Sequence, residues 1–397
     1  MTQPQPLAGI VVLDFGQIYN GPYCGFLLAM AGARVIKIES PQGESLRGRA
    51  ERSSASYPFA MLNSNKDAIT LNLKSERGRE LLRGLVVKAD VLLENFSPGT
   101  MDRLGVGADV LRVVNPRLIY AAATGFGRTG LHRDYLAMDI TVQAMSGVMA
   151  ITGDGDGAPL KAGPALCDFL GGIHLYSAIM TALFQRERTG AGAVVDVAMQ
   201  DAVFPTLASA IGARYFLGRH PARTGNRHFA LSLAPYNVYR ARDGYVAIIC
   251  IREGHWRNLV EAMRRPELLT DPRFADMAAR AKNMDAVDAT VEAWTSTLDK
   301  DAVFRITQAH DIICAPVQDL DDVLDDPHLH ARGMLNRVHH PLLGDAVLPS
   351  TPLRFEGVEP PPLRVSRDLG ADNEAVYGEL LGLSPNEVAR LRRDEAI

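Results

Sequence analysis

One carboxylate, Asp168, stands where a loop meets the start of an apolar helix, within the stretch 139–172. A Gly/Asp-rich turn at 153–157 precedes it, and two glycines followed by an apolar run over 173–184 come after it. An aspartate at such a junction can cap the helix by accepting backbone N–H groups. It can also attack a carbonyl carbon as a nucleophile. The residue type alone leaves both roles open.

The neighbouring thiol of Cys167 is a second possible nucleophile. No histidine lies near it in the sequence to form the thiolate, so we favour Asp168. The other cysteines are scattered without metal-ligand spacing, and we expect no metal site and four reduced thiols (Cys24, Cys167, Cys250 and Cys314). The N-terminal residues lack the basic and apolar regions of a signal peptide, which indicates a cytoplasmic protein.

Length and composition are those of an ordinary globular chain of two domains. The 397 residues are 47% hydrophobic and 22% charged. A formal net charge of −4 predicts no broad attraction to nucleic acid or to an anionic membrane. The longest apolar run is interrupted by His174 and Ser177, so no membrane span is expected.

Strand and helix patterns alternate through the first half of the chain. Apolar strands are predicted at 7–15, 34–38, 69–73, 91–94, 118–123 and 194–198, with helices at 23–31, 76–88 and 140–149 among the segments between them. This alternation predicts an α/β fold with a doubly wound sheet. The first turn, 16–20, lacks G-x-G-x-x-G, so no nicotinamide site is expected. It still lies at the carboxyl end of a strand, where open α/β sheets bind ligands.

The second half predicts a smaller domain and a return to the first. We place a large α/β domain at 1–205, a linker at 206–225, a small α+β domain at 226–325, and a linker with C-terminal return at 326–397. A long helix is expected at 200–215, and Asp243-Gly244 is a turn signal that leads into a strand. Further helices are predicted at 255–263, 283–297, 301–310 and 374–392, with a short strand at 312–317 and an extended segment at 326–363.

Many blocks in one order resemble class III CoA-transferases of the CaiB/BaiF type. The resemblance covers nearly the whole chain, which makes it more specific than any short motif. The blocks include LAGIVVLDFGQIYNGPYCGFLLAMAGARVIKIE at 7–39, ADVLLENFSPGTMDRLG at 89–105, NPRLIYAAATGFGRTG at 115–130, and D-x-x-x-Q-A-x-S-G at 139–147 followed by Asp168.

The family resemblance implies a fold, a reaction and an assembly. It implies a Rossmann-like large domain, a smaller domain and a homodimer of two interlocked chains. It implies transfer of CoA from an acyl-CoA thioester to a free carboxylic acid, with Asp168 as the nucleophile that forms a mixed anhydride and then an aspartyl-CoA thioester. CoA and acyl-CoA are then substrates, and no tightly bound cofactor is expected.

Positions that match the CoA-binding motifs of the family are expected to line the site. Arg103 is expected to pair with a phosphate of CoA, because guanidinium–phosphate pairs are bidentate and strong; the alternative is a helix-surface arginine. Tyr19 is either beside the reacting carbonyl or an aromatic at the edge of the core. The full set carried over by resemblance is Gln17, Tyr19, Asn20, Leu71, Leu73, Lys74, Asn95, Phe96, Arg103 and Met138.

Two departures from the family pattern bear on the substrates. Ser40-Pro41 stand where the family often has a basic residue, so the adenosine end of CoA is assigned weakly to Arg47 or Arg49. The segment 40–66 that carries them is either a phosphate-gripping loop or a solvated surface. The four-glycine run of formyl-CoA transferase is replaced by LSLAPY at 231–236, which disfavours formate and oxalate as the natural pair.

Two other functions remain open at this stage. The racemase branch of the family commonly has a histidine before Asp139, and Met138 cannot move a proton, so 2-methylacyl-CoA epimerisation is disfavoured. A CoA-binding homologue without turnover is the other alternative. Asp139 is either a helix cap, which we favour, or lies near the acid substrate. A succinate-like dicarboxylate is our hypothesis for one acid, held by Arg223, Arg227 and His228 unless these form a basic linker facing water.

Overall fold

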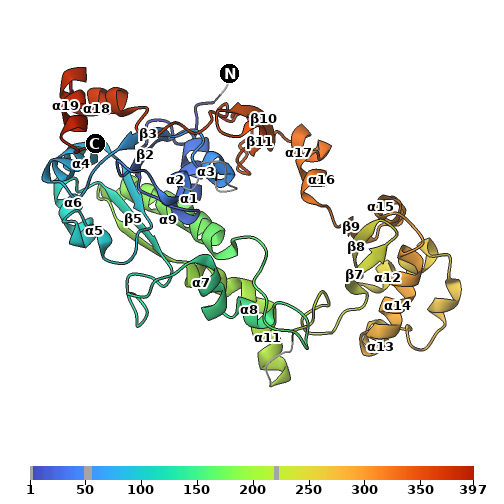
Figure 1. Ribbon diagram of the computed structural model, residues 1–397. Coiled ribbons are helices and arrows are strands. Elements are labelled where there is room, and N and C mark those ends of the chain that lie inside the picture. The colour runs from blue at the N-terminus through green and yellow to red at the C-terminus, as the bar shows by residue number, and fades with distance from the viewer. Residues whose placement is uncertain (1–2, 49–55, 219–222) are drawn as a thin grey trace. The chain divides into compact units, whose positions relative to one another are not determined.

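A computed structural model describes residues 3–48, 56–218 and 223–397 (Figure 1). The chain divides into two units. The first comprises Met1–Ser146, Gly163–Pro205 and Asp326–Ile397, and the second comprises Gly147–Ala162 and Thr206–Asp325. Each unit has its own sheet and its own hydrophobic core.

The first unit is built on a six-stranded parallel sheet in the order β3-β2-β1-β4-β5-β6. The predicted parallel α/β core is confirmed. The strands are β1 (Val11–Asp14), β2 (Arg34–Glu39), β3 (Asp67–Thr70), β4 (Val91–Glu94), β5 (Ile119–Thr124) and β6 (Val194–Ala198).

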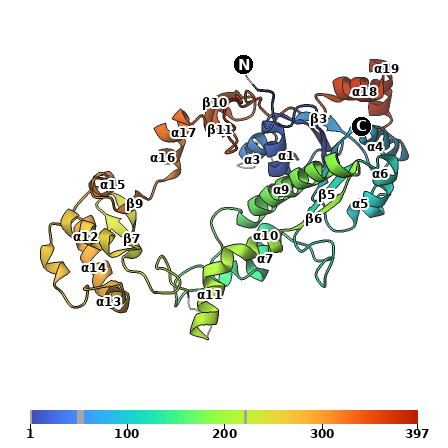
Figure 2. The ribbon, with the colours of Figure 1, turned by 180° about the vertical axis from the view of Figure 1, so that it is seen from behind.

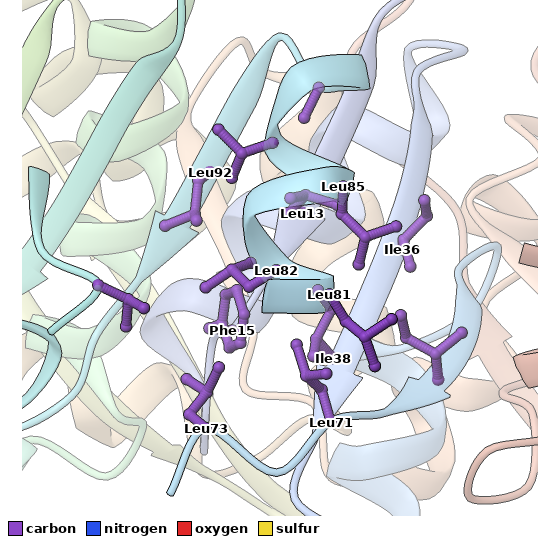
Figure 3. Packing of buried hydrophobic residues seen from close by; sticks show 14 of the residues in the cluster. Leu13, Phe15, Ile36, Ile38, Leu71, Leu73, Leu81, Leu82, Leu85 and Leu92 are labelled. Carbon is purple, nitrogen blue, oxygen red and sulfur yellow. The ribbon is translucent and has the colours of Figure 1, made fainter. Parts of the chain in front are cut away.

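Alternate residues of the strands pack against helices on the two faces of this sheet. On one face, Val12 of β1 and Val35 of β2 lie in a core shared with α1 (Asn20–Met30) and α9 (Leu166–Thr189). On the other, the next residues along, Leu13 and Ile36, pack against α4 (Glu76–Lys88) (Figure 3). α6 (Ala108–Val114) adds Leu111 to this second core. A period of two along each strand therefore produces the doubly wound arrangement.

The order of the strands locates a ligand crevice. The chain moves outward from β1 to β2 and β3, then returns to the other side of β1 to form β4, β5 and β6. In open α/β sheets, ligands bind at the carboxyl ends of the strands where the order reverses. Here that point lies between β1 and β4, so the residues after Asp14 and after Glu94 border the crevice.

Helix α9 crosses one face of the sheet (Figure 2). Among the described helices it alone is long and apolar enough to span a membrane by length and composition, so the expectation that no apolar run reaches that length is wrong. His174 and Ser177 do not break it, because they lie on its exposed side and bond back to Leu170 and Ile173 carbonyls. Its buried side, which includes Leu175 and Ile179, packs in the sheet core. This packing accounts for the apolar composition.

Several predicted helices are shorter or broken in the structure. The helix expected at 140–149 is split into α7 (Asp139–Met145) and α8 (Val148–Ile151), because Gly147 is left-handed with φ of 92°. The helix expected at 200–215 is α10 (Met199–Val203), a 3-10 turn η1 (Phe204–Leu207) and α11 (Ala208–Leu217). Pro205 accounts for this second break, since it has no N–H to donate. Short helices also occur at α2 (Ser45–Gly48), α3 (Ser56–Leu62) and α5 (Thr100–Arg103).

The second unit has a three-stranded antiparallel sheet in the order β7-β8-β9. The Asp243-Gly244 turn joins β7 (Tyr236–Ala241) to β8 (Gly244–Ile249). The unit also includes Gly147–Ala162, a segment predicted to lie in the large domain, and Arg223 donates to carbonyls in it. Its other elements are α12 (Glu253–Ala262), η2 (Pro266–Leu269), α13 (Met277–Lys282), α14 (Met284–Thr295), α15 (Lys300–Ala309), β9 (Ile313–Pro316) and α16 (Leu320–Leu324).

The C-terminal residues belong to the first unit. The tail helix expected at 374–392 is two helices, α18 (Asn373–Leu381) and α19 (Pro385–Arg393), separated by left-handed Gly382. The Tyr377 hydroxyl of α18 donates to the Thr70 carbonyl at 2.7 Å, which ties the tail to the end of β3. The segment expected to be extended contains α17 (Pro327–Ala331) and a hairpin of β10 (Leu335–His340) and β11 (Gly344–Pro349).

Candidate active site

A cavity of about 640 Å³ opens at the carboxyl ends of β1, β4 and β5, where the strand order predicts a ligand crevice. Its volume lies in the range of small-molecule sites. Apart from Asp168, its lining consists of neutral polar and apolar groups, and no lysine or arginine of the described chain is among them. The residues are Gln17, Ile18, Asn20, Asn95, Phe96, Ser97, Pro98, Thr100, Ala123, Thr124, Gly125, Tyr135, Leu136, Ala137, Met138, Thr141, Asp168 and Met199.

Asp168 reaches this cavity from the first turn of α9. The residue at the cap position is Ala165, so Asp168 does not cap its own helix. Within the described residues its carboxylate accepts no hydrogen bond, although the residue is only 8% exposed. A buried carboxylate with free lone pairs at a cavity wall suits attack on a bound carbonyl carbon.

The Asp139 carboxylate supplies the cap that α9 lacks. Its Oδ1 accepts the backbone N–H of Cys167 at 2.8 Å and that of Asp168 at 3.3 Å, and its Oδ2 accepts from Gln143 Nε2 at 2.6 Å. The favoured role of Asp139 as a helix cap therefore holds for α9, a helix that starts almost 30 residues later, and not for α7, which it opens.

Burial and a like charge act together on Asp168. Burial, and then repulsion from the Asp139 carboxylate, raise the pKa of Asp168 from 3.8 to about 7. The N-terminus of α9 favours the ionised form in the opposite direction. The pKa of the Asp168 carboxyl therefore lies near neutral pH.

Burial also makes the Cys167 thiol a weaker candidate for a nucleophile than the Asp168 carboxylate. The Cys167 side chain is fully buried, and burial followed by the charges of Asp139 and Asp168 raises the pKa of its thiol to about 12. A neutral buried thiol is a poor nucleophile at neutral pH. The preference for Asp168 over Cys167 has this physical basis.

Gln17 and Asn95 join the two sides of the crevice. The Gln17 backbone N–H donates to Asn95 Oδ1 at 2.6 Å, and Asn95 Nδ2 donates to the Gln17 carbonyl at 2.9 Å. The loop after β1 is thereby fixed to the loop after β4. Asn20 is buried in the same wall, and its Oδ1 has no hydrogen-bond partner in the described part of the chain. A buried acceptor of this kind is costly unless a ligand or water satisfies it.

The two glycines after Asp168 serve packing. Both residues lie inside α9, which continues through them, so neither belongs to a turn after Asp168. A Cβ on Gly171 would meet Asn20 Nδ2 at 2.3 Å, and one on Gly172 would meet the Asn20 carbonyl at 2.7 Å. The glycines therefore let α1 approach the turn that carries Asp168.

A second buried carboxylate supports the wall beside Asn95. Glu94 accepts the backbone N–H of Phe96 at 2.9 Å and the Tyr120 hydroxyl at 3.2 Å. Burial raises the pKa of Glu94 to about 7. It lines a smaller cavity of about 190 Å³ that shares Phe96 with the main one.

Five of the ten binding positions taken from the family resemblance line the cavity and five do not. Gln17, Asn20, Asn95, Phe96 and Met138 line it together with Asp168. Of the other five, Leu71 and Leu73 are buried in a core cluster, and Lys74 and Arg103 are exposed. The fifth is Tyr19, whose ring centroid lies 6.0 Å from that of Phe169.

Arg103 lies one contact away from the cavity. Its guanidinium donates to the Pro98 carbonyl and to Thr100 Oγ1, both at 3.0 Å, and both residues line the cavity. Arg103 therefore holds the turn that forms the rim, and its side chain is exposed.

The other predicted cations are already engaged or lie outside the described residues. Arg47 makes a two-point contact with the Glu39 carboxylate at 3.0 and 2.8 Å and lies over the Phe59 ring. Arg49 is outside the described residues. In the second unit, Arg223 donates to main-chain carbonyls, and Arg227 pairs with the carboxylates of Asp285 and Asp288. His228 Nδ1 is 3.2 Å from Ser232 Oγ.

Sequence reasoning missed most of the loop residues of the cavity. Ser97, Pro98 and Thr100 follow β4, and Ala123 to Gly125 end β5. Their positions at the carboxyl ends of predicted strands could have indicated them. Tyr135 and Leu136 belong to an irregular loop that carries no such signal.

Comparisons with known proteins identify the family to which the chain belongs. The family profile of CoA-transferase family III matches residues 7–373. A formyl-CoA:oxalate CoA-transferase of Streptomyces coelicolor is 37% identical over 98% of this chain and 99% of that protein. A succinyl-CoA:mesaconate CoA-transferase of Haloarcula marismortui is 37% identical over 88% and 90% of the two chains. A succinyl-CoA–D-citramalate CoA-transferase of Chloroflexus aurantiacus is 34% identical over 99% and 98%.

The fold is also that of a solved relative. A crystal structure of a CAIB/BAIF family protein from Brucella suis superposes with a TM-score of 0.85 at 34% identity, over 95% of this chain and 100% of that one. Sequence and structure thus agree over nearly the full length, and the chain belongs to CoA-transferase family III.

Proposed function

We propose that this protein transfers CoA from an acyl-CoA thioester to a free carboxylic acid, with Asp168 as the covalent nucleophile. The observation that carries the proposal is a buried carboxylate that accepts no hydrogen bond from the described residues, in the wall of a cavity at the switch point of the sheet. Membership of the family supports it.

The first half of the reaction loads Asp168. An oxygen of the Asp168 carboxylate attacks the thioester carbonyl, the C–S bond breaks, and the CoA thiolate leaves behind a mixed anhydride. The thiolate then attacks the aspartyl carbonyl of the anhydride. This releases the donor acid as its carboxylate and leaves CoA bound to Asp168 as a thioester.

The second half runs the same steps with the acceptor acid. Its carboxylate attacks the aspartyl thioester and displaces CoA thiolate, and the thiolate attacks the acyl carbon of the new anhydride. The products are the new acyl-CoA and the original Asp168 carboxylate, with no water or proton consumed. Covalent catalysis divides one difficult exchange into steps of similar energy.

Neutral groups around Asp168 suit this chemistry. Each tetrahedral intermediate carries an oxyanion that fixed donors stabilise. Gln17 and Asn20 bring side-chain amides into the same wall as Asp168 and add no charge that would hold the departing thiolate or acid. Arg103, at the rim, has N–H groups left to meet a phosphate of CoA.

We infer that the exchanged acids include a short dicarboxylate. The names of the relatives pair CoA with oxalate, mesaconate or citramalate, each of which has two carboxylates. Arg223 and Arg227 are engaged within the second unit, so their assignment to the second carboxylate loses its support. We further propose an interlocked homodimer, as the family resemblance implies, and a cytoplasmic location, in keeping with the four free cysteines.

Exchange of labelled CoA between two acids tests the proposal. Wild-type protein with succinyl-CoA or acetyl-CoA as donor should transfer CoA to at least one of succinate, mesaconate, glutarate or oxalate. Asp168→Ala should abolish transfer, and the variant should still be folded, as shown by a cooperative thermal unfolding transition. Full activity of that variant would end the proposal, and inactivity with every dicarboxylate would end the choice of acid.

A further inference from the structure

A cluster of fully buried charges packs against residues 16–22, which form the loop after β1 and the first turn of α1 and are called here the closed loop. It consists of Asp14, Lys37, Glu44 and Lys66, each no more than 4% exposed, and is called here the buried charge cluster. Its ion pairs are Lys66 with Asp14 at 2.7 Å and Lys37 with Glu44 at 3.1 Å. Replacing such pairs by apolar residues often leaves stability unchanged or improved, so stability alone is a weak reason to have them.

The buried charge cluster bonds to both ends of that loop. At its start, the Gly16 N–H donates to Asp14 Oδ1 at 2.7 Å, and the Lys37 ammonium donates to the Gly16 carbonyl. At its end, Lys66 Nζ donates to the Pro22 carbonyl at 2.9 Å. The same Lys66 nitrogen bonds Asp14, so one ion pair joins the two ends.

The loop is closed at its neck by two glycines. A Cβ on Gly16 would lie 2.7 Å from the Gly21 carbonyl carbon and the Pro22 nitrogen, and a Cβ on Gly21 would lie 2.7 Å from Gly16 Cα. The backbone therefore returns onto itself between these residues. The part that projects into the cavity wall carries Gln17, Ile18 and Asn20.

Ile18 shows that this closed loop is held in a strained form. Its φ is +62°, a left-handed conformation that β-branched residues rarely adopt. Such strain persists only when the surroundings over-determine the backbone, and it clusters at functional sites. Here the surroundings are the buried charge cluster behind the loop and the two Asn95 hydrogen bonds to Gln17.

We propose that Asp14, Lys37 and Lys66 are positioning residues for the transfer reaction. They hold the closed loop 16–22 so that Gln17 and Asn20 stay in the wall they share with Asp168. They act through the backbone of the loop and do not touch the substrate. The effect on rate rests on the CoA-transferase activity proposed above, whereas the effect on the loop itself does not.

Two readouts test the inference in the full-length protein. Asp14→Asn/Lys66→Met removes both charges of one pair together, so that neither is left buried alone. Hydrogen–deuterium exchange of the peptide spanning 15–22 should become about tenfold faster, with the strands of the sheet unchanged. With acyl-CoA and an acid, kcat should fall by roughly tenfold to a hundredfold, the cost of misplacing a group by about 1 Å, while KM for acyl-CoA changes little.

A matched variant separates positioning from general destabilisation. Arg186 is 4% exposed and pairs with Asp90 at 2.8 Å in the same unit, near the end of α9 remote from Asp168. Arg186→Met should lower the melting temperature and leave kcat and the exchange of 15–22 as in the wild type. Equal kcat and equal loop exchange in the Arg186 and Asp14/Lys66 variants would overturn the inference.

Ile18 provides a second test that needs no change in the buried charge cluster. Ile18→Gly removes the left-handed strain and frees the backbone, whereas Ile18→Ala shortens the side chain and keeps the restriction. The glycine variant should show faster loop exchange and at least about fivefold lower kcat than the alanine variant, without a lower melting temperature. The same kcat and exchange in both would count against the inference. Should the wild type transfer no CoA, the exchange readout alone decides it.

Discussion

Asp139 and Asp168 meet through the backbone: the Asp139 carboxylate accepts the N–H of Asp168 at 3.3 Å, and burial followed by the Asp139 charge raises the pKa of the Asp168 side chain. The Asp139 carboxylate therefore fixes the turn that carries Asp168, and its negative charge favours the protonated form of Asp168. A positively charged side chain beside Asp168 would have kept its carboxylate ionised but would have lowered its nucleophilicity. This pairing fits a nucleophile that must give up its charge on each acylation.

The first prediction concerns Asp139→Asn. The amide keeps an oxygen that can accept the N–H groups of Cys167 and Asp168 but carries no charge. The pKa of Asp168 should fall, since burial remains and repulsion is lost. The acid limb of kcat/KM against pH should therefore move to lower pH by about half a unit to one unit. A limb that moves to higher pH would contradict this account.

Asp139→Ala is the matched variant. It removes the cap of α9 as well as the charge, so it should lose about 1 kcal/mol of stability that Asp139→Asn retains. Urea unfolding of the two variants at the same pH measures the difference. Equal stabilities would mean that the hydrogen bonds to Cys167 and Asp168 do not support the helix.

The second prediction is the pH dependence of the wild type. The proposed attack by Asp168 needs its ionised carboxylate, and its pKa is about 7. kcat/KM for acyl-CoA should be constant above that pH and fall about tenfold per pH unit well below it. Glu94 has a similar pKa, so Glu94→Gln serves as the control and should keep the limb. Loss of the limb in that variant would assign it to Glu94.

The third prediction follows from the same pKa through linkage. The folded state holds a proton on Asp168 between its ordinary pKa of 3.8 and about 7, where the unfolded chain has released it. The contribution of Asp168 to stability therefore falls as pH rises through that window, by at most about 4 kcal/mol. Asp168→Asn should raise the melting temperature at pH 8 and change it little at pH 4. A lower melting temperature at pH 8 would contradict the burial cost.

The fourth prediction concerns Gly172. A methyl group there would lie 2.7 Å from the Asn20 carbonyl, a backbone atom that cannot rotate away. Gly172→Ala should cost about 1–3 kcal/mol of stability and displace α1 from α9, with reduced transfer. Gly254→Ala, where the added Cβ meets nothing within 4 Å, is the control and should be neutral or slightly stabilising. Thermal unfolding of both variants measures this.

The parts of the fold that sequence predicts best are those governed by local patterns. The helix expected at 76–88 coincides with α4, since Ser75 caps it and its apolar residues recur at helical spacing. The strand expected at 69–73 ends at Thr70, because Asn373 and Tyr377 bond there from a segment about 300 residues later. Leu71 and Leu73 lie beyond the end of the strand and pack in a hydrophobic core. Their period-two alternation continues that of the strand, so the sequence pattern alone does not show where the strand ends.

The candidate site follows the same division. Gln17 and Asn95 could be anticipated because they follow predicted strands at a sheet edge. The capping of α9 by Asp139 could not, since the two lie 28 residues apart and α7 and α8 intervene. The bonds of Lys37 and Lys66 to Gly16 and Pro22 likewise depend on how β1, β2 and α1 meet.

Identifying the residue that acyl-CoA modifies covalently tests the proposed role of Asp168. Protein incubated with acyl-CoA and trapped with hydroxylamine is digested and sequenced by tandem mass spectrometry. A hydroxamate is expected on Asp168 in the wild type and should be missing from Asp168→Asn. CoA exchange that proceeds with no label on Asp168, or with the label on another residue, would contradict that role.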